Sequence, residues 1–175
     1  MNSQSGFLIG IGSNIEPHDN LVAIIDQLLE YFSKITLSRV LLLPPIGMNS
    51  QYDFLNVVVF IETAMAEEEL KEICNAIETS QGRDRTDPTR KTKDRPADLD
   101  ILSPAQFPKD GERASHTITD EYFLYPLLDE IAAYVSGKHI SVEQEGVALM
   151  NVNLAFGQTA TTIHRQTDTR NKRII

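Results

Sequence analysis

The chain lacks the residues and segments that define several large protein classes. Its single cysteine, Cys74, excludes an internal disulfide and a metal cluster held by thiolates. No apolar run approaches the length of a membrane span, and the first residues, M-N-S-Q-S-G, lack the basic segment and apolar stretch of a signal peptide. We therefore expect a cytoplasmic protein with no membrane partner.

Positive charge is scarce as well. The chain has 16 lysines and arginines against 25 aspartates and glutamates, a net charge of −9 at pH 7. A surface of this sign repels the phosphate backbone, so we expect no nucleic-acid partner. The 175 residues contain no internal repeat or low-complexity linker and suffice to bury one core. We expect a single domain over residues 1–175.

The scarce positive charge is concentrated just before two aspartates. Six basic residues lie within 13 positions, namely Arg83, Arg85, Arg90, Lys91, Lys93 and Arg95. Asp98 and Asp100 follow, and a strand over 97–103 would place both carboxylates on one face while Leu99 and Ile101 enter the core. This pattern favours a loop that closes on a polyanion beside a metal held by carboxylates. A simpler interpretation pairs the two aspartates with Arg83 and Arg95 in weak surface ion pairs.

Hydrophobic periodicity predicts strands and helices in the order β-α-β-β-α-β. We expect strands at 7–12, 35–43, 54–62 and 97–103, a helix capped by Asp19 or Asn20, and further helices at 66–81 and 126–134. This is the split βαβ pattern. The predicted class is α/β (α+β): a ferredoxin-like sandwich with a mainly antiparallel sheet and helices packed on it.

The remaining segments carry weaker signals. Gly12 followed by Ser13-Asn14 indicates a turn at the end of the first strand, and the Pro and Gly content of 104–113 indicates a loop. Residues 139–156 form either a strand pair or a strand and a helix. We expect the polar, basic tail 161–175 to be frayed.

Strand 54–62 carries one polar residue among apolar ones, Asn56. A buried amide needs hydrogen-bond partners, and either a neighbouring backbone or a bound ligand would supply them. Phe54 shares the face of Asn56, and an aromatic surface beside an amide suits a heteroaromatic ring. Cys74 belongs to the buried stripe of its helix, where it is a core residue and not a nucleophile.

Several motifs together resemble the 6-hydroxymethyl-7,8-dihydropterin pyrophosphokinase family. The matching segments are I-G-I-G-S-N, P-P-I-G, D-F-L-N-V-V-V-F-I-E-T, I-E-T-S-Q-G-R-D-R, R-P-A-D-L-D-I-L and F-L-Y-P-L-L-D-E-I-A. They occur in the family's order from residue 7 to about 135. Residues 136–175 are an unassigned extension.

The resemblance implies transfer of diphosphate from ATP to the pterin hydroxymethyl group in folate biosynthesis, giving AMP and the pterin diphosphate. By position, Asp98 and Asp100 would hold two Mg²⁺ ions. The implied pterin-binding residues are Pro44, Ile46, Phe54, Asn56 and Tyr122. The implied ATP contacts are Glu78, Arg83, Arg85, Arg95, Arg113 and His116, and the implied catalytic residues are both aspartates with Arg83, Arg85 and Arg95. The expected partners are ATP and a reduced pterin, bound by a monomer.

Three features depart from the family's pattern. The chain has no tryptophan, its basic loop is longer, and Asp120 occupies the position of a family arginine, where it would repel a phosphate. His116 fits a surface loop as well as an ATP contact. The alternative hypothesis is a diverged paralogue that binds a pterin or nucleotide with little turnover or acts on a related pterin.

Overall fold

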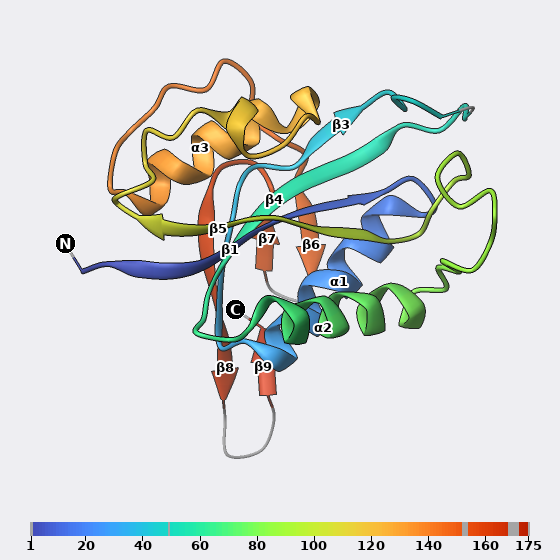
Figure 1. Cartoon of the computed structure of the whole chain (residues 1–175), viewed down its shortest axis with the longest axis horizontal. Coiled ribbons are helices and arrows are strands. Elements are labelled where there is room, and N and C mark those ends of the chain that lie inside the picture. The colour runs from blue at the N-terminus through green and yellow to red at the C-terminus, as the bar shows by residue number, and fades with distance from the viewer. Residues whose placement is uncertain (1, 49, 152–153, 168–171, 175) are drawn as a thin grey trace.

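The computed structural model describes residues 2–48, 50–151, 154–167 and 172–174 (Figure 1). Its centre is a seven-stranded sheet whose neighbouring strands pair antiparallel. The strand order is β5 (Asp98–Phe107), β1 (Gln4–Ser13), β4 (Phe54–Glu62), β2 (Lys34–Leu37), β8 (Thr161–Thr167) and β9 (Lys172–Ile174), and β3 (Leu41–Leu43) also pairs with β4.

Helices α1 (Pro17–Tyr31) and α2 (Glu67–Ser80) connect strands of this sheet. With the strand order β5-β1-β4-β2 they form a β-α-β-β-α-β unit. This arrangement confirms the predicted ferredoxin-like sandwich with a mainly antiparallel sheet. Within the described residues, no helix has the length and apolar character that crossing a membrane requires.

Helices cover both faces of the sheet (Figure 1). Because successive residues of a strand point to opposite faces, Ile9 packs with the core of α1 and α2, whereas Leu8 packs with α3 (Tyr125–Val135). Five apolar residues of α1 are buried at helical spacing, namely Leu21, Ile24, Ile25, Leu28 and Leu29, and Cys74 in α2 is buried as predicted. Burial raises the pKa of the Cys74 thiol to about 12, in agreement with a core role.

The predicted strand 35–43 is wrong, because the segment divides into β2 and β3. Ser38 continues the pairing with β4, donating its N–H to the Val58 carbonyl at 2.9 Å. Val40 instead bonds to the C-terminal part of the chain: its N–H donates to Gly157 O, and its carbonyl accepts from Val147 N–H, both at 2.8 Å. A run of aliphatic residues does not indicate where the chain changes its hydrogen-bonding partner.

Two other segments also differ from expectation, whereas the turn predicted at Ser13-Asn14 agrees with β1, which ends at Ser13. The loop predicted from residue 104 is wrong in its first part, since β5 continues through Pro104 to Phe107. β5 tolerates Pro104 because it is an edge strand and needs no further N–H. α1 begins at Pro17 after Glu16, which has a φ of 40°, so neither Asp19 nor Asn20 is the cap.

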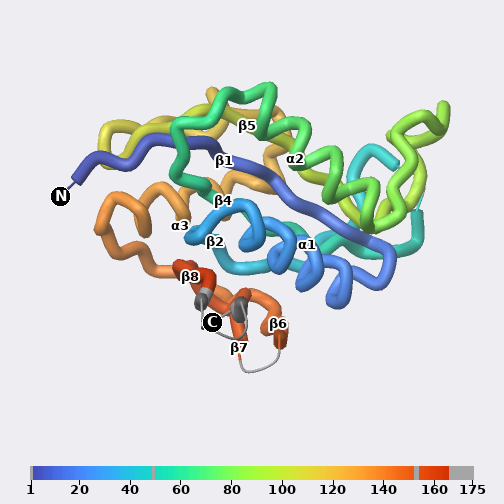
Figure 2. The backbone as a smooth tube through the Cα atoms, turned by 90° about the horizontal axis from the view of Figure 1, so that it is seen from below, coloured from blue at the N-terminus to red at the C-terminus, as the bar shows by residue number. Residues whose placement is uncertain are grey.

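The C-terminal segment is more ordered than predicted. β6 (Leu149–Asn151) and β7 (Leu154–Phe156) form a strand pair, which was one of the two expectations. The prediction of a frayed tail is wrong for β8, which pairs with β2. Its Ile163 is buried in the core against α1. In Figure 2 this segment lies beside α1 and β2. Ile163 is the single apolar residue of β8, which is too weak a period to predict the strand.

Candidate active site

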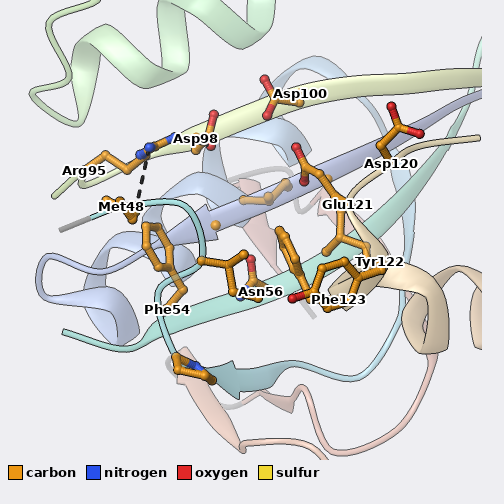
Figure 3. Close-up of a pocket in the computed structure, with 16 residues that line it drawn as sticks. Met48, Phe54, Asn56, Arg95, Asp98, Asp100, Asp120, Glu121, Tyr122 and Phe123 are labelled. Atoms are coloured by element: carbon orange, nitrogen blue, oxygen red, sulfur yellow. Dashed lines mark hydrogen bonds and ion pairs between the residues drawn. The ribbon is translucent and has the colours of Figure 1, made fainter. Parts of the chain in front are cut away.

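The two aspartates share one face of the edge strand β5, as predicted. Asp98 pairs with Gly12 of β1 and Asp100 with Gly10, while Leu99 between them is buried. Both carboxylates face a cavity of about 330 Å³ (Figure 3). The strand alternation therefore places two acidic groups at the wall of a pocket.

The opposite wall of the pocket comes from β4, the loop after β3 and the 3₁₀ turn before α3. All five predicted pterin-binding residues line it, namely Pro44, Ile46, Phe54, Asn56 and Tyr122. Tertiary structure thus brings the predicted aromatic and amide residues to the same cavity as the predicted carboxylates. Figure 3 shows Phe54 and Asn56 across the pocket from Asp98 and Asp100.

Asn56 lies directly opposite Gly12 in the β1–β4 register. A Cβ at Gly12 would stand 3.1 Å from the amide oxygen of Asn56, so the glycine leaves room for that side chain. The side-chain amide of Asn56 makes no hydrogen bond to another residue that the structure describes, although Asn56 is only 7% exposed. A buried amide that faces a cavity without a protein partner is available to a ligand.

Asp98 is enclosed by arginines. Its Oδ1 accepts a hydrogen bond from Arg83 at 2.7 Å, and its Oδ2 accepts one from Arg95 at 2.9 Å. The Asp98 side chain is 20% exposed and that of Arg83 only 6%, so these are not the weakly stabilising surface pairs of the simpler interpretation. Arg95 also lies with its guanidinium carbon 5.8 Å from the Phe54 ring centroid and links the two walls.

Glu78 lies behind this cluster and outside the pocket. Its side chain is 2% exposed, and it accepts two hydrogen bonds from Arg85, both at 2.7 Å, and one from Arg83 at 3.2 Å. The C-terminal end of α2 positions it: Gly82, with a φ of 93°, turns the chain so that Arg83 N–H returns to the Glu78 carbonyl at 3.0 Å. Sequence matching identified Glu78, but not that it lies beneath the arginines.

The pKa values of the two aspartates are shifted in opposite directions. Burial alone would raise the pKa of Asp98, but the charges and hydrogen bonds of Arg83 and Arg95 outweigh it and hold that pKa below its usual value. Burial, followed by repulsion from Asp98 and Glu121, raises the pKa of Asp100 to about 7. One carboxylate is held ionised by protein cations, and the other has no comparable neutralisation.

Of the predicted ATP contacts, only Arg95 lines the cavity; Arg113 and His116, like Glu78, Arg83 and Arg85, are not among the lining residues. Arg113 donates to Ser103 Oγ at 2.8 Å, and His116 is exposed on a short 3₁₀ turn, η1 (Ser115–Thr117). The exposed position matches the surface-loop interpretation of His116.

Some pocket residues were not predicted from the sequence. Glu121 and Phe123 enter from the 3₁₀ turn η2 (Tyr122–Leu124) and its preceding residue, next to Asp120, which also lines the pocket. Gly10 belongs to the floor, where an added Cβ would stand 3.2 Å from the Leu124 side chain. The sequence does contain a signal for this floor: Gly10 and Gly12 lie two residues apart, and a strand places both of them on one face.

A ferredoxin-like sheet that carries paired carboxylates, arginines and an aromatic–amide pocket has the features of an enzyme that moves a phosphate group onto a heteroaromatic substrate. Comparison with known families makes this specific. The model of the 7,8-dihydro-6-hydroxymethylpterin-pyrophosphokinase (HPPK) family matches residues 8–131, and the chain belongs to this family.

Individual relatives agree. A 2-amino-4-hydroxy-6-hydroxymethyldihydropteridine pyrophosphokinase from Porphyromonas gingivalis is 33% identical over 103 residues, which cover 58% of this chain and 70% of the relative. The Bacillus subtilis protein of the same name is 31% identical over 152 residues, 79% of this chain and 86% of the relative. The predicted pyrophosphokinase of folate biosynthesis, with ATP as co-substrate, is thereby confirmed. The comparisons give no support to the paralogue alternative.

Proposed function

We propose that the cavity between β5 and β4 is where diphosphate passes from ATP to the hydroxymethyl group of 6-hydroxymethyl-7,8-dihydropterin, releasing AMP. The observation that carries this proposal is the position of the Asp98–Asp100 pair across one cavity from Phe54 and Asn56. A heteroaromatic ring bound at the second pair would project its substituent toward the first. Holding the two reactants in this way supplies a large part of the rate of a phosphoryl transfer.

On the pterin side, Phe54 would stack on the ring and Asn56 would pair with its polar edge. The amide offers both a donor and an acceptor, as a pterin edge requires. Pro44, Ile46 and Tyr122 would complete an apolar enclosure. Because Asn56 has no partner among the described residues, binding a pterin would cost it no protein hydrogen bond.

On the metal side, the residues present fit magnesium. A carboxylate offers about four lone-pair sites, and Arg83 and Arg95 occupy only part of those on Asp98. Among the described residues no three His, Cys, Asp or Glu side chains gather around one point, so phosphate oxygens and water would complete the coordination of Mg²⁺. When bound, two such ions would offset the charge of the triphosphate and of the leaving oxygen.

The arginines would bind and orient the phosphates. Arg85 is the most available, with a side chain 41% exposed and its Nη2 3.7 Å from Asp100 Oδ1. Arg95 lies between the two walls, and Arg83 is held below by Glu78. Guanidinium groups can turn a fork of donors to phosphate oxygens, which fits a catalytic role for all three. ATP contacts by Arg113 and His116 remain a prediction.

The test is to incubate the full chain with ATP, Mg²⁺ and 6-hydroxymethyl-7,8-dihydropterin and to follow AMP and pterin diphosphate. We expect both products in equal amounts and neither without pterin or after chelation of magnesium. Pterin binding without AMP above the no-pterin control would overturn the proposal.

We also propose that residues 1–175 act as one domain and as a monomer in the cytoplasm, where ATP is available. The supporting observations are that the C-terminal strands β8 and β9 belong to the same sheet as the strands of the site, and that one cavity holds both the carboxylates and the aromatic–amide pair. Sedimentation of the full chain at assay concentration should give a single species near 19.6 kDa. A dimer that persists on dilution would contradict the monomer.

A further inference from the structure

Two loops that are distant in sequence meet at the pocket. The first loop, residues 44–53, carries Pro44 and Ile46 of the apolar wall, and the basic loop, residues 83–97, carries Arg95. The described residues of both loops, 44–48, 50–53 and 83–97, belong to no strand or α-helix. Their relative position therefore depends on side chains that join them.

Asn14, the residue after β1, lies between the two loops and is 4% exposed. Its amide oxygen accepts the N–H of Arg95 at 2.7 Å, and its own N–H donates to the Arg95 carbonyl at 3.0 Å. Its Nδ2 donates to Asp94 Oδ1 at 2.8 Å and lies 3.3 Å from Ser50 Oγ. One buried amide thus contacts both loops and fixes the backbone of Arg95.

Asp94 joins the loops directly. The hydroxyl of Ser50 donates to Asp94 Oδ1, the same oxygen that accepts from Asn14. Ser50 Oγ in turn accepts the N–H of Tyr52 at 3.1 Å, which orients the hydroxyl. The carboxylate of Asp94 is therefore the point at which β1, the first loop and the basic loop are hydrogen-bonded together; we call it the loop latch (Asn14, Ser50 and Asp94).

The loop latch is adjacent to Arg95, a residue that contacts both walls of the pocket. Arg95 bonds to Asp98 at 2.9 Å and lies 5.8 Å from the Phe54 ring centroid. Its Nη2 also approaches Met48 Sδ of the first loop at 3.9 Å (Figure 3). A side chain with four rotatable bonds keeps such a position only if its backbone is held, which the loop latch does.

We propose that Asp94, with Ser50 as its partner, is a positioning residue for the diphosphate transfer: it holds the basic loop against the first loop and keeps Arg95 between the pterin wall and the carboxylates. The inference rests on the proposed function of the pocket. Arg95 would lie between the two substrates. Loss of the latch should therefore reduce kcat and the coupling factor, which is the factor by which bound nucleotide increases the affinity for the pterin. It should have a smaller effect on either affinity alone.

The experiment compares Asp94→Ala, Asp94→Asn and Ser50→Ala in the full chain. Pterin affinity is measured with and without a magnesium complex of a non-hydrolysable ATP analogue, and kcat is measured by AMP release. Asp94→Ala should lower both kcat and the coupling factor about tenfold, the value of a lost hydrogen bond to a charged group. Asp94→Asn keeps an acceptor oxygen and should stay within about threefold of the wild type.

The double variant Ser50→Ala/Asp94→Ala should be no worse than Asp94→Ala, because both changes break the same contact. Asp84→Ala is the matched control: it removes an aspartate of the basic loop that accepts hydrogen bonds from Thr86 of its own turn, and it should change neither quantity. If Asp94→Ala loses its far-UV circular dichroism, Ser50→Ala, which removes one hydroxyl, carries the test.

Two results would overturn the positioning role. One is a wild-type protein that makes AMP while Asp94→Ala and Ser50→Ala match Asp84→Ala in kcat and coupling. The other is an Asp94→Asn variant as impaired as Asp94→Ala, which would assign the effect to charge and not to the hydrogen bonds. Failure of the wild type to make AMP would instead reject the proposed function.

Discussion

The two walls of the pocket differ in whether their polar side chains already have hydrogen-bond partners within the protein. On the charged wall, Asp98 accepts hydrogen bonds from Arg83 and Arg95. Behind this wall, Glu78 accepts hydrogen bonds from Arg83 and Arg85. On the apolar wall, Asn56 faces the cavity without a partner among the described residues. A pterin would therefore meet a surface ready for it, whereas phosphates must share or replace the carboxylate partners of the arginines.

The largest expected effect separates the two aspartates of the charged wall. Asp98→Asn and Asp100→Asn should each lower kcat by about a thousandfold or more, since both remove a proposed metal ligand. Only Asp98→Asn should also lower the free energy of unfolding, by about 3 kcal/mol, because it removes the carboxylate charge that pairs with Arg95 and one of the two that pair with buried Arg83. AMP release and urea unfolding measure the two quantities. Equal stabilities of the two variants would contradict the difference.

The next effect tests whether Glu78 supports the arginines. Glu78→Gln keeps the side-chain shape but removes the charge that faces two guanidinium groups. We expect the free energy of unfolding to fall by about 2–4 kcal/mol and kcat to fall with it. Glu112→Gln is the control, since its ion pair with Lys138 is exposed and its loss should leave the free energy of unfolding unchanged. A stable but inactive Glu78→Gln would favour direct contact with the nucleotide.

A smaller effect should mark the apolar wall. Phe54→Leu keeps the site apolar but removes ring stacking, so the KM for the pterin should rise about tenfold. The KM for ATP and the free energy of unfolding should change little. Steady-state kinetics with each substrate varied measures the split. If the KM for ATP rises equally, Phe54 supports Arg95 and not the pterin.

The smallest effect lies outside the pocket, at Asp26 on α1. Burial, followed by repulsion from Glu30, raises its pKa from 3.8 to about 6, although Asn151 donates to its Oδ1 at 2.5 Å. The folded state then holds the proton more tightly, so this group's contribution to stability is complete below pH 4 and is lost as pH rises to about 6. Asp26→Asn should therefore gain stability relative to the wild type across that window.

Because Asp26 is only half-buried, solvent screening should keep this gain below about 1 kcal/mol at pH 7. Thermal unfolding at a series of pH values measures it, with His18→Gln on the same helix as a control. A difference between wild type and Asp26→Asn that does not vary from pH 4 to pH 7 would show that Asp26 keeps an ordinary pKa in the folded protein.

Much of the site was predictable because it lies on strands. Phe54 and Asn56, or Asp98 and Asp100, are two residues apart, and a strand puts such pairs on one face in any fold. Glu78 was identified by its motif, but its place beneath the arginines follows from the turn at Gly82. Glu121 was missed because it comes from a short turn whose direction no local period predicts.

By itself the sequence determined the α/β order, the helix stripes, the strand faces of the site residues and the family. These follow from periodicities of 2 and 3.6 residues and from motifs, which are properties of neighbours along the chain. Only the tertiary structure decided that Val40 changes partner, that β8 joins the sheet, that Asp98 is neutralised by arginines while Asp100 is not, and that Asp94 meets Ser50. Each of these depends on contacts between distant segments, whose hydrogen bonds and charges no local pattern records.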